Sequence, residues 1–338
     1  MSTGTFTFPK DLEHKPICVI GNFNIDLIIR NVPHLPVWGQ EVMGTDHVQV
    51  SSGQTGYLAF ALRCLGVPTS VIGNIGQDIY GEQILRDLER YQLDAHGVEI
   101  TPGAPTGITV AIVRPDGERA FVSNLGSLLA FDEHMALSHW DQAEEAGIIC
   151  LVGLFMIPNL DFAAATRLLA RARREGKLTM LDSGWDPENW PEKTRRGFSQ
   201  MLAETSIFMP NLDEGRALTG KETPEEAAMA LQALGPSVVV VKCGSQGSHL
   251  RVGEQSMSLP AREVSVFDAV GAGDVFNSGF LYALRSGMPW KTCLAVGNSS
   301  ASLYISRAEN RFPSLDEVLS TARSAYPGIL IQGPVHQP

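Results

Sequence analysis

The sequence contains few cysteines and few basic residues, and it has no long hydrophobic segment. Its five cysteines are odd in number and form no CxxC pair, which predicts neither a disulfide framework nor a cysteine zinc site and fits a reducing, cytoplasmic location. Lys and Arg number 26 against 37 Asp and Glu, and the net charge of −11 argues against a nucleic-acid partner. The longest apolar run, residues 146–158, is too short to cross a bilayer, so we expect no membrane partner.

Several motifs of other enzyme classes are also missing. No GxGxxG joins the first predicted strand to a helix, which disfavours the main rival class, the dinucleotide-binding oxidoreductases. There is no HExxH, and His134 and His139 are spaced wrongly for one helix face, so we expect surface or core roles for the histidines. Residues 215–221 almost form a P-loop, but Glu222 stands where Ser or Thr must bind Mg²⁺. We predict a short helix over residues 212–219 instead, ended by Gly220.

The chain shows an alternation of strand and helix patterns. Apolar residues make up 44% of the sequence, which is enough for a sizeable core. This alternation predicts an α/β fold with a mostly parallel sheet between two helical layers. The predicted strands are residues 17–20, 67–72, 148–152, 178–181, 207–209 and 238–241, and the predicted helices are residues 57–65, 162–175 and 225–234.

Two stretches break this alternation. Residues 27–50 and 106–124 have the pattern of short antiparallel strands, and we predict that they form a small β-lid projecting from the main sheet. No linker-like segment divides the chain, so residues 1–338 are interpreted as one composite domain.

A glycine-rich turn carries the clearest chemical signal. Gly271, Ala272 and Gly273 precede Asp274, and the apolar periodicity that follows predicts that the turn opens a helix. The free amides of such a turn, including that of Asp274 itself, suit a transferring phosphoryl group, and a carboxylate beside them can accept a proton from an attacking hydroxyl. The alternative is that Asp274 only stabilises the helix N-terminus, which contributes under about 1 kcal/mol.

Residues 268–274, DAVGAGD, resemble the DTxGAGD signature of the ribokinase/PfkB carbohydrate kinase family, with Ala269 where Thr is usual. The resemblance implies a ribokinase-like three-layer α/β/α sandwich with a mostly parallel central sheet and a small projecting β-lid. It also implies ATP and Mg²⁺ as cofactors, Asp274 as the general base, and an anion hole formed by Gly271 to Gly273. Many relatives use a monovalent cation such as K⁺ near the positions of Asp268 and Ser306, so K⁺ is a further option.

Other blocks resemble the family in order along the chain. The block at residues 24–26 implies that Asn24 and Asp26 bind substrate hydroxyls, and residues 52–57 resemble the first family signature and add Gly53 and Gln54. Tyr57 stands where the family usually has an Asn that faces the substrate. Its ring has two interpretations, stacking on the substrate or packing under the lid.

The second half of the chain resembles the nucleotide side of the family. Asn211 and Glu214 match its NxxE motif, which implies that they organise Mg²⁺ and phosphates through water; Glu214 as an ordinary first-turn carboxylate is the alternative. Residues 238–247 resemble the strand and loop beside the nucleotide, with Lys242, Gly244 and Gly247 as contacts. Asn298 falls where the family closes its adenine pocket, or it simply packs in a helix.

The combined prediction is an ATP-dependent kinase that phosphorylates a hydroxyl of a small sugar or related polyol. Two alternatives remain: a nucleoside kinase of the same fold, and a non-catalytic ligand-binding member, because Tyr57 and Ala269 depart from the pattern. A neutral acceptor is favoured because the N-terminal half offers only Arg30, Arg63, Arg114 and Arg119 for a sugar phosphate. The exposed edge expected for the lid favours a homodimer.

Overall fold

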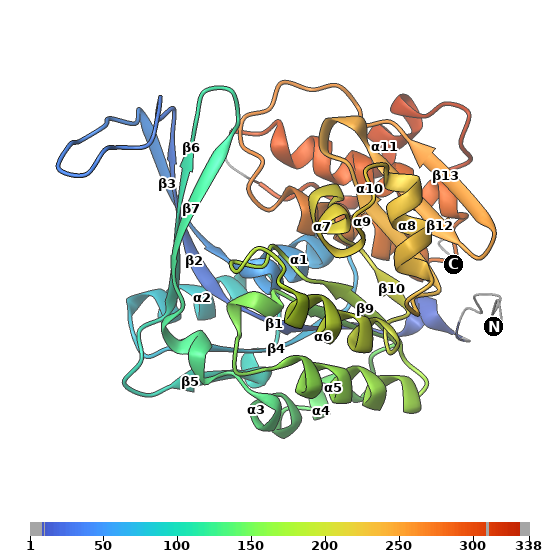
Figure 1. The fold of residues 1–338 in the computed structure, drawn as a ribbon, viewed down its shortest axis with the longest axis horizontal. Coiled ribbons are helices and arrows are strands. Elements are labelled where there is room, and N and C mark those ends of the chain that lie inside the picture. The colour runs from blue at the N-terminus through green and yellow to red at the C-terminus, as the bar shows by residue number, and fades with distance from the viewer. Residues whose placement is uncertain (1–8, 10, 309–310, 332–338) are drawn as a thin grey trace.

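A nine-stranded sheet forms the centre of the structure, a computed structural model that describes residues 9, 11–308 and 311–331 (Figure 1). Its strand order is β13-β12-β11-β10-β9-β8-β1-β4-β5. Neighbours from β11 to β5 run parallel, and β12 pairs antiparallel with β11 and β13. In sheet order the strands are β13 (Gln255–Leu259), β12 (Ser248–Val252), β11 (Val238–Lys242), β10 (Ile207–Phe208), β9 (Leu178–Asp182), β8 (Ile148–Val152), β1 (Ile17–Gly21), β4 (Thr69–Gly76) and β5 (Val98–Thr101).

Helices cover both faces of this sheet. Successive side chains of a strand point to opposite faces, so Ile17 and Val19 of β1 join one core cluster while Cys18 and Ile20 join the other. The first cluster packs under α1 (Gly53–Cys64), α2 (Ile79–Arg90), α9 (Ala272–Arg285), α10 (Trp290–Ile305) and α11 (Leu315–Ala325). The second packs under α3 (Glu133–Ser138), α4 (Asp141–Glu144), α5 (Phe162–Arg174), α6 (Glu192–Leu202), α7 (Leu212–Thr219) and α8 (Pro224–Gln232). The predicted three-layer α/β architecture is confirmed.

A second sheet of four strands rises from one side of the molecule (Figure 1). Its order is β3 (Asp46–Ser52), β2 (Asn24–Arg30), β6 (Gly107–Val113) and β7 (Arg119–Asn124), and we call it the lid. It comes from the two stretches that break the alternation in the sequence, but β2 starts three residues earlier than expected. The pairs β2·β3 and β6·β7 are antiparallel, whereas β2·β6 is parallel, because each stretch forms its own antiparallel pair and the two pairs meet through their first strands.

Several element boundaries differ from the prediction. Helix α1 begins at Gly53 rather than Tyr57, and β4 runs to Gly76 instead of ending at Ile72. In both cases the added residues are mostly small or polar, so the sequence pattern did not extend the element over them. Tertiary contacts bury these residues and decide where the element ends. Helix α7 matches the prediction: it ends at Gly220, which adopts a left-handed φ of 68°, and this confirms that the near P-loop is a helix C-terminus.

Short 3₁₀ turns connect these elements: η1 (Leu12–His14), η2 (Ala95–Gly97), η3 (Gly126–Ala130), η4 (Leu154–Met156) and η5 (Gly244–Gln246). Within the described ranges, none of the helices combines the length and the apolar composition that crossing a membrane requires.

Candidate active site

The turn before helix α9 forms the centre of the candidate site. Gly271 has a φ of 78°, and a Cβ atom there would lie 2.7 Å from the Tyr57 ring, so the position suits only glycine. The amide of Ala272 donates to a carbonyl of the preceding turn at 3.2 Å, which engages one of the predicted anion-hole donors. The amides of Gly273 and Asp274 lie in the first helical turn, where no carbonyl four residues earlier can accept from them within the helix. These two amides are therefore the donors that an anion would meet.

The carboxylate of Asp274 lies in the same turn and is buried. Its Oδ1 atom has no hydrogen-bond partner among the described residues. Burial and the nearby charge of Asp182 raise the pKa of Asp274 well above its ordinary value, although Lys242 and a hydrogen bond from Gln54 oppose this shift. A buried carboxylate oxygen without a partner is costly, and it is the kind of atom to which a ligand brings the missing donor.

Asp182, which the sequence analysis missed, neutralises the lysine of the site. It ends strand β9, forms an ion pair with the Lys242 ammonium, and accepts a hydrogen bond of 2.6 Å from Asn277 of α9. Burial lowers the pKa of Lys242, but Asp182 and Glu214 outweigh it and hold that pKa above the ordinary lysine value. Ligand-binding residues gather at the carboxyl ends of parallel strands, and the position after the predicted strand 178–181 was the signal available in the sequence.

A chain of polar side chains runs from the main sheet into the lid. Asn22 donates to Asn24 at 2.8 Å, and Asn24 donates to Asp26 at 2.8 Å and to Ser52 at 3.0 Å. Burial raises the pKa of Asp26 to about 6, although hydrogen bonds from Ser52, Tyr57 and Asn24 act to lower it. The predicted substrate-binding carboxylate is thus held in one orientation by its neighbours.

Tyr57 packs under the lid, which decides between its two interpretations. Its ring is buried, with centroids 6.4 Å from those of Tyr304 and Phe312, and it belongs to the cluster that lid residues Val48 and Val50 cover. Its hydroxyl donates to Oδ2 of Asp26 at 2.9 Å. Tyr57 therefore orients Asp26 rather than presenting its ring as a stacking surface.

Gly53 and Gln54 open helix α1 beside these residues. Gly53 has a φ of 84°, and a Cβ atom there would lie 2.2 Å from the carbonyl oxygen of Asn22, so the close approach of the two segments requires glycine. The Gln54 amide donates to Oδ1 of Asn22 at 3.3 Å. A Cβ atom on Gly184 would lie 2.9 Å from Oε1 of Gln54, which places this side chain next to the loop that follows β9. Gln54 thus lies between the segments that follow β1 and β9.

Asn211 and Glu214 form a capping box at the start of helix α7. The Asn211 backbone and side-chain nitrogens donate to the two Glu214 carboxylate oxygens at 2.9 and 2.8 Å, and the Glu214 amide donates back to Asn211 at 2.9 Å. Burial, followed by the charge of Asp182, raises the pKa of Glu214 to about 7. This residue is both a first-turn carboxylate and a buried charge. Because both of its oxygens accept from Asn211, contact with Mg²⁺ through water fits the donor set better than direct ligation.

Gly244 begins the turn η5 and Gly247 follows it, while Asn298 packs against the strands beyond this turn. Gly247 has a φ of 97°, and a Cβ atom there would lie 2.1 Å from the Leu259 carbonyl oxygen. Asn298 is buried in α10, accepts from Ser248 at 3.1 Å and donates to the Leu259 carbonyl at 3.2 Å. The Asn298 amide therefore holds β12 and the end of β13 together, which agrees with the packing alternative for this residue.

Asp268, the first residue of the glycine-turn signature, pairs with an arginine of the lid. Arg30 donates through Nε at 3.1 Å and Nη2 at 2.9 Å to Oδ2 of Asp268, and both side chains are buried. The other oxygen of Asp268 accepts from the Val270 amide at 2.8 Å. Arg30 also donates to Asp46 at 2.8 Å, and its guanidinium lies 4.8 Å from the centre of the Phe267 ring. The lid strand β2 is thereby anchored to the turn that precedes α9.

The structure brings the charged residues among those predicted, together with Asp182, into one network. The charges of Asp26 and Asp182 act on Asp274, and those of Asp182 and Lys242 act on Glu214, so substrate, base and metal candidates share one electrostatic environment. This environment lies where the lid meets the carboxyl ends of the central strands. Such an arrangement can bind an anion at the α9 turn and hold a hydroxyl-bearing molecule against Asp274.

Comparison with solved structures defines the class of fold. The structure of *Arabidopsis thaliana* ribokinase complexed with ribose and ATP matches 91% of this chain and 99% of its own, with a TM-score of 0.77 at 25% identity. A *Burkholderia thailandensis* nucleoside kinase in complex with inosine has the same TM-score at 17% identity, covering 93% of this chain and 100% of its own. The chain has a ribokinase-like fold.

The family model of the pfkB family carbohydrate kinases matches residues 14–317. The chain belongs to this family and is a phosphotransferase with an alcohol group as acceptor. It is 28% identical to the ribokinase of *Arabidopsis thaliana* over 322 residues, which is 91% of this chain and 80% of that protein. It is also 28% identical to an uncharacterized sugar kinase of *Archaeoglobus fulgidus* over 245 residues, which is 72% of this chain and 93% of that protein.

Proposed function

We propose that the protein transfers the γ-phosphoryl group of ATP to a hydroxyl of a small neutral sugar or related polyol. In this proposal Asp274 is the general base, and the turn Gly271 to Gly273 forms the anion hole through the amides of Gly273 and Asp274. Asp26 and Asn24 hold the hydroxyls of the acceptor, and Gln54 orients Asp274. The non-catalytic alternative does not fit a phosphotransferase family whose signature carboxylate is present.

The single observation that carries the proposal is the unpartnered Oδ1 of Asp274. It is buried beside two first-turn amides that lack helical partners, so a proton acceptor and an anion site occupy one turn of helix. An acceptor hydroxyl placed there would donate its proton to Oδ1 while its oxygen attacks the phosphorus in line. A purely structural role would leave that oxygen bonded, as the oxygens of Glu214 are.

On the nucleotide side we propose that Lys242, Gly244, Gly247 and Asn211 contact ATP, with Asn298 shaping the adenine side of the pocket. Bound Mg²⁺ supplies charge neutralisation of the phosphates, and Glu214 would hold it through water. The raised pKa of Glu214 fits this role, because a nearby divalent cation would stabilise its ionised form. The Lys242 ammonium lies 3.3 Å from the position of a Cβ on Gly273, which places its charge beside the α9 turn.

A neutral acceptor agrees with how the basic residues are used. Arg30 is paired with Asp268, Lys242 with Asp182, and Arg114 with Asp116, while Arg63 of α1 donates to the carbonyl of Tyr91, which follows α2. These contacts make the three arginines and Lys242 less available to a sugar phosphate, and the remaining candidate, Arg119, is an exposed residue at the start of lid strand β7. A nucleoside is the second candidate acceptor, and a panel of sugars and nucleosides, assayed for ADP release with ATP, separates the two.

The variant Asp274→Asn tests the proposal. We expect kcat to fall at least about 100-fold, because a positioned general base contributes roughly 10² to 10⁴-fold, while ATP affinity stays near that of the wild type. Glu192→Gln is the matched control, since Glu192 is a first-turn carboxylate of α6 that is exposed and paired with Arg196. Near-normal kcat in Asp274→Asn would remove Asp274 from the role of base.

Three further features remain proposals. We propose a homodimer formed through the lid, because edge strand β7 exposes Phe121 and Val122, by 52% and 65%, and an unpaired edge tends to find a partner. Sedimentation of the purified protein distinguishes a monomer from a dimer.

The proposed cytoplasmic location rests only on the cysteines, whose number and spacing predict no disulfide framework. A monovalent cation such as K⁺ near Asp268 remains the prediction of the resemblance, but Arg30 already places a positive charge there, and we propose that it takes this role.

A further inference from the structure

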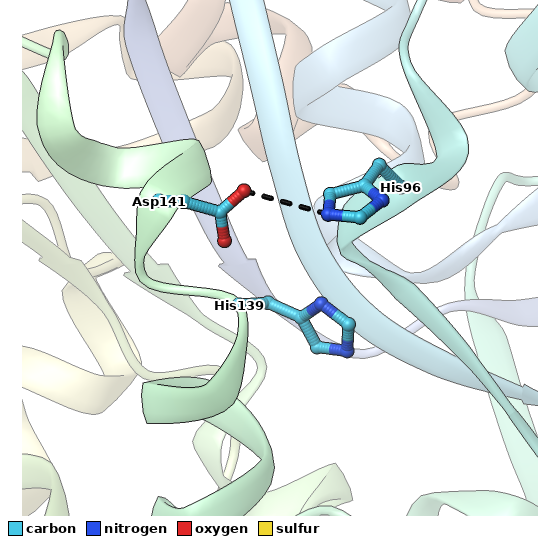
Figure 2. A group of neighbouring side chains, drawn as sticks. All are labelled: His96, His139 and Asp141. Atoms are coloured by element: carbon cyan, nitrogen blue, oxygen red, sulfur yellow. Dashed lines mark ion pairs between the residues drawn. The ribbon is translucent and has the colours of Figure 1, made fainter.

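Two histidines and an aspartate converge at the edge of the main sheet, away from the α9 turn (Figure 2). His96 lies in η2, His139 follows helix α3, and Asp141 is the first residue of α4. One ligand atom of each lies within 4.8 Å of the others. The Nε2 atom of His96 is 3.5 Å from a carboxylate oxygen of Asp141, and the two imidazole rings meet edge to face at 5.9 Å.

A fourth residue, Glu99 of β5, orients the less exposed histidine. Its carboxylate is 3.6 Å from Nε2 of His139, whose side chain is 20% exposed. Figure 2 shows the other ring nitrogen of His139 on the side that faces His96 and Asp141. A carboxylate on the distal nitrogen of a ligating histidine is a recurring arrangement, because it fixes the tautomer and makes the other nitrogen a better donor to a metal.

The backbone beneath the cluster is held in place. The His96 amide donates to the Asp94 side chain at 2.9 Å, and the Ser70 hydroxyl donates to the Gln142 carbonyl at 2.6 Å, which ties α4 to β4. A Cβ atom on Gly97 would lie 2.0 Å from the Val71 carbonyl oxygen. The close approach of η2 to β4 therefore requires a glycine at this position. These contacts hold the backbone of η2 and α4 against β4.

We propose that His96, His139 and Asp141 bind one Zn²⁺ ion, with water in the fourth position and Glu99 holding His139. Two imidazoles and one carboxylate suit Zn²⁺ among the common divalent ions, whereas Mg²⁺ prefers oxygen ligands only. Tetrahedral bonds of about 2.0 to 2.1 Å require ligand atoms about 3.3 Å apart. Small side-chain rotations close the remaining difference, because His96 and Asp141 are 64% and 51% exposed and free to adjust.

The ion would join the edge strand to the helical layer. His96 and Glu99 belong to the segment that contains β5, and His139 and Asp141 flank the junction of α3 with α4. The site is built on the edge of the sheet opposite β13, and none of its residues belongs to the charged network around Asp274. Zn²⁺ bound here would stabilise the fold without entering phosphoryl transfer.

Calorimetric titration of untagged, metal-free protein with ZnCl₂ in excess Mg²⁺ tests the proposal. We expect one saturable site per chain, and a loss of affinity of roughly tenfold or more in His96→Ala, His139→Ala and Asp141→Asn. Glu99→Gln should also weaken binding. His134→Ala is the matched control, because His134 is exposed on the same helix α3 but outside the cluster, and it should bind as the wild type does.

Two further measurements address the type of site. Co²⁺ used as the probe should give the visible absorption of a tetrahedral complex in the wild type and in His134→Ala alone. Zn²⁺ should also raise Tm in these two proteins and leave it unchanged in the three ligand variants. Absence of a saturable site, or equal Zn²⁺ affinity in the wild type and the three ligand variants, would overturn the proposal.

Discussion

Three buried carboxyl groups define the site at the scale of single residues. Asp26, Glu214 and Asp274 each have a raised pKa, and burial is the first cause in every case. Desolvation of a carboxylate is expensive, and the charge of Lys242 offsets part of this cost at Glu214 and Asp274. Such a cluster is destabilising by itself, and it indicates a site built for a ligand that carries donors and a cation.

The pH dependence of stability follows from these pKa shifts. The folded protein keeps protons on these groups to higher pH than the unfolded chain, so each of them contributes a negative slope of the unfolding free energy with pH from about pH 4 up to its folded-state pKa. Their destabilising effect grows through pH values of about 6 to 7, where Asp26 and Glu214 ionise in the folded state. We expect the Tm of ligand-free protein to decline over this window.

Replacement of one carboxyl group isolates the effect. Asp274→Asn should have a higher Tm than the wild type near pH 8, and its advantage should vanish as the pH is lowered toward about 4, because the wild-type carboxyl is then neutral. Differential scanning calorimetry across this range measures the difference. Glu192→Gln should follow the wild-type curve, and an Asp274→Asn Tm below that of the wild type at pH 8 would contradict the assignment of an unpaired buried charge.

At the scale of elements, the start of helix α9 depends on a left-handed glycine. Gly271 lets the chain turn sharply into the helix, and its lack of a side chain leaves room for the Tyr57 ring. The same turn presents the Gly273 and Asp274 amides. The geometry of the proposed anion hole is therefore tied to one backbone conformation and one packing contact.

Gly271→Ala and Gly287→Ala separate the effect of the left-handed backbone conformation from the effect of the contact with Tyr57. Both residues flank α9 with a φ of 78° and 68°, so alanine costs each about 1 to 2 kcal/mol of backbone strain. Nothing lies within 4 Å of a Cβ on Gly287, whereas one on Gly271 would collide with Tyr57. We expect a small loss of stability and normal activity in Gly287→Ala. Gly271→Ala should unfold at lower denaturant concentration than Gly287→Ala and lose most of its kcat; equal behaviour of the two variants would refute this.

At the scale of the whole molecule, Arg30 connects the lid to the turn that precedes α9. It lies at the end of lid strand β2 and pairs with Asp268, which in turn holds the Val270 amide one residue before the glycine turn. The same strand carries Asp26. The proposed substrate contacts and the proposed anion hole are therefore linked through one buried ion pair. A movement of the lid would displace the turn before α9 through this pair.

This ion pair predicts that the enzyme does not depend on K⁺. Activity with a fixed acceptor and MgATP should be equal in K⁺ and in tetramethylammonium salts, because the guanidinium already neutralises Asp268. Removing one partner of a buried ion pair costs about 3 to 5 kcal/mol, so Arg30→Met is expected to be unstable, and Arg30→Lys, which keeps the charge, is the informative variant. Arg30→Lys should retain part of the activity without K⁺. Strong activation of the wild type by K⁺ would reject the role given to Arg30.

Several features were predictable from the sequence because they depend on neighbours along the chain. The strand and helix alternation follows from periodicity, and the turn before Asp274, the cap at Gly220 and the Asn211 to Glu214 motif each lie within one turn of helix. Backbone hydrogen bonding and left-handed glycine conformations act over a few residues, so a short motif contains their full description.

Other features arose only when distant segments met. Asp182 and Lys242 are far apart in sequence, as are Arg30 and Asp268, and His96 and Asp141 belong to different layers. The position of Tyr57 under the lid and the raised pKa of Asp274 both result from burial, which is a property of the packed molecule. The sequence alone determined which residues could do the chemistry and which elements carry them. Tertiary structure decided which charges are paired, because electrostatic energy depends on distance and solvent exposure, and folding sets both.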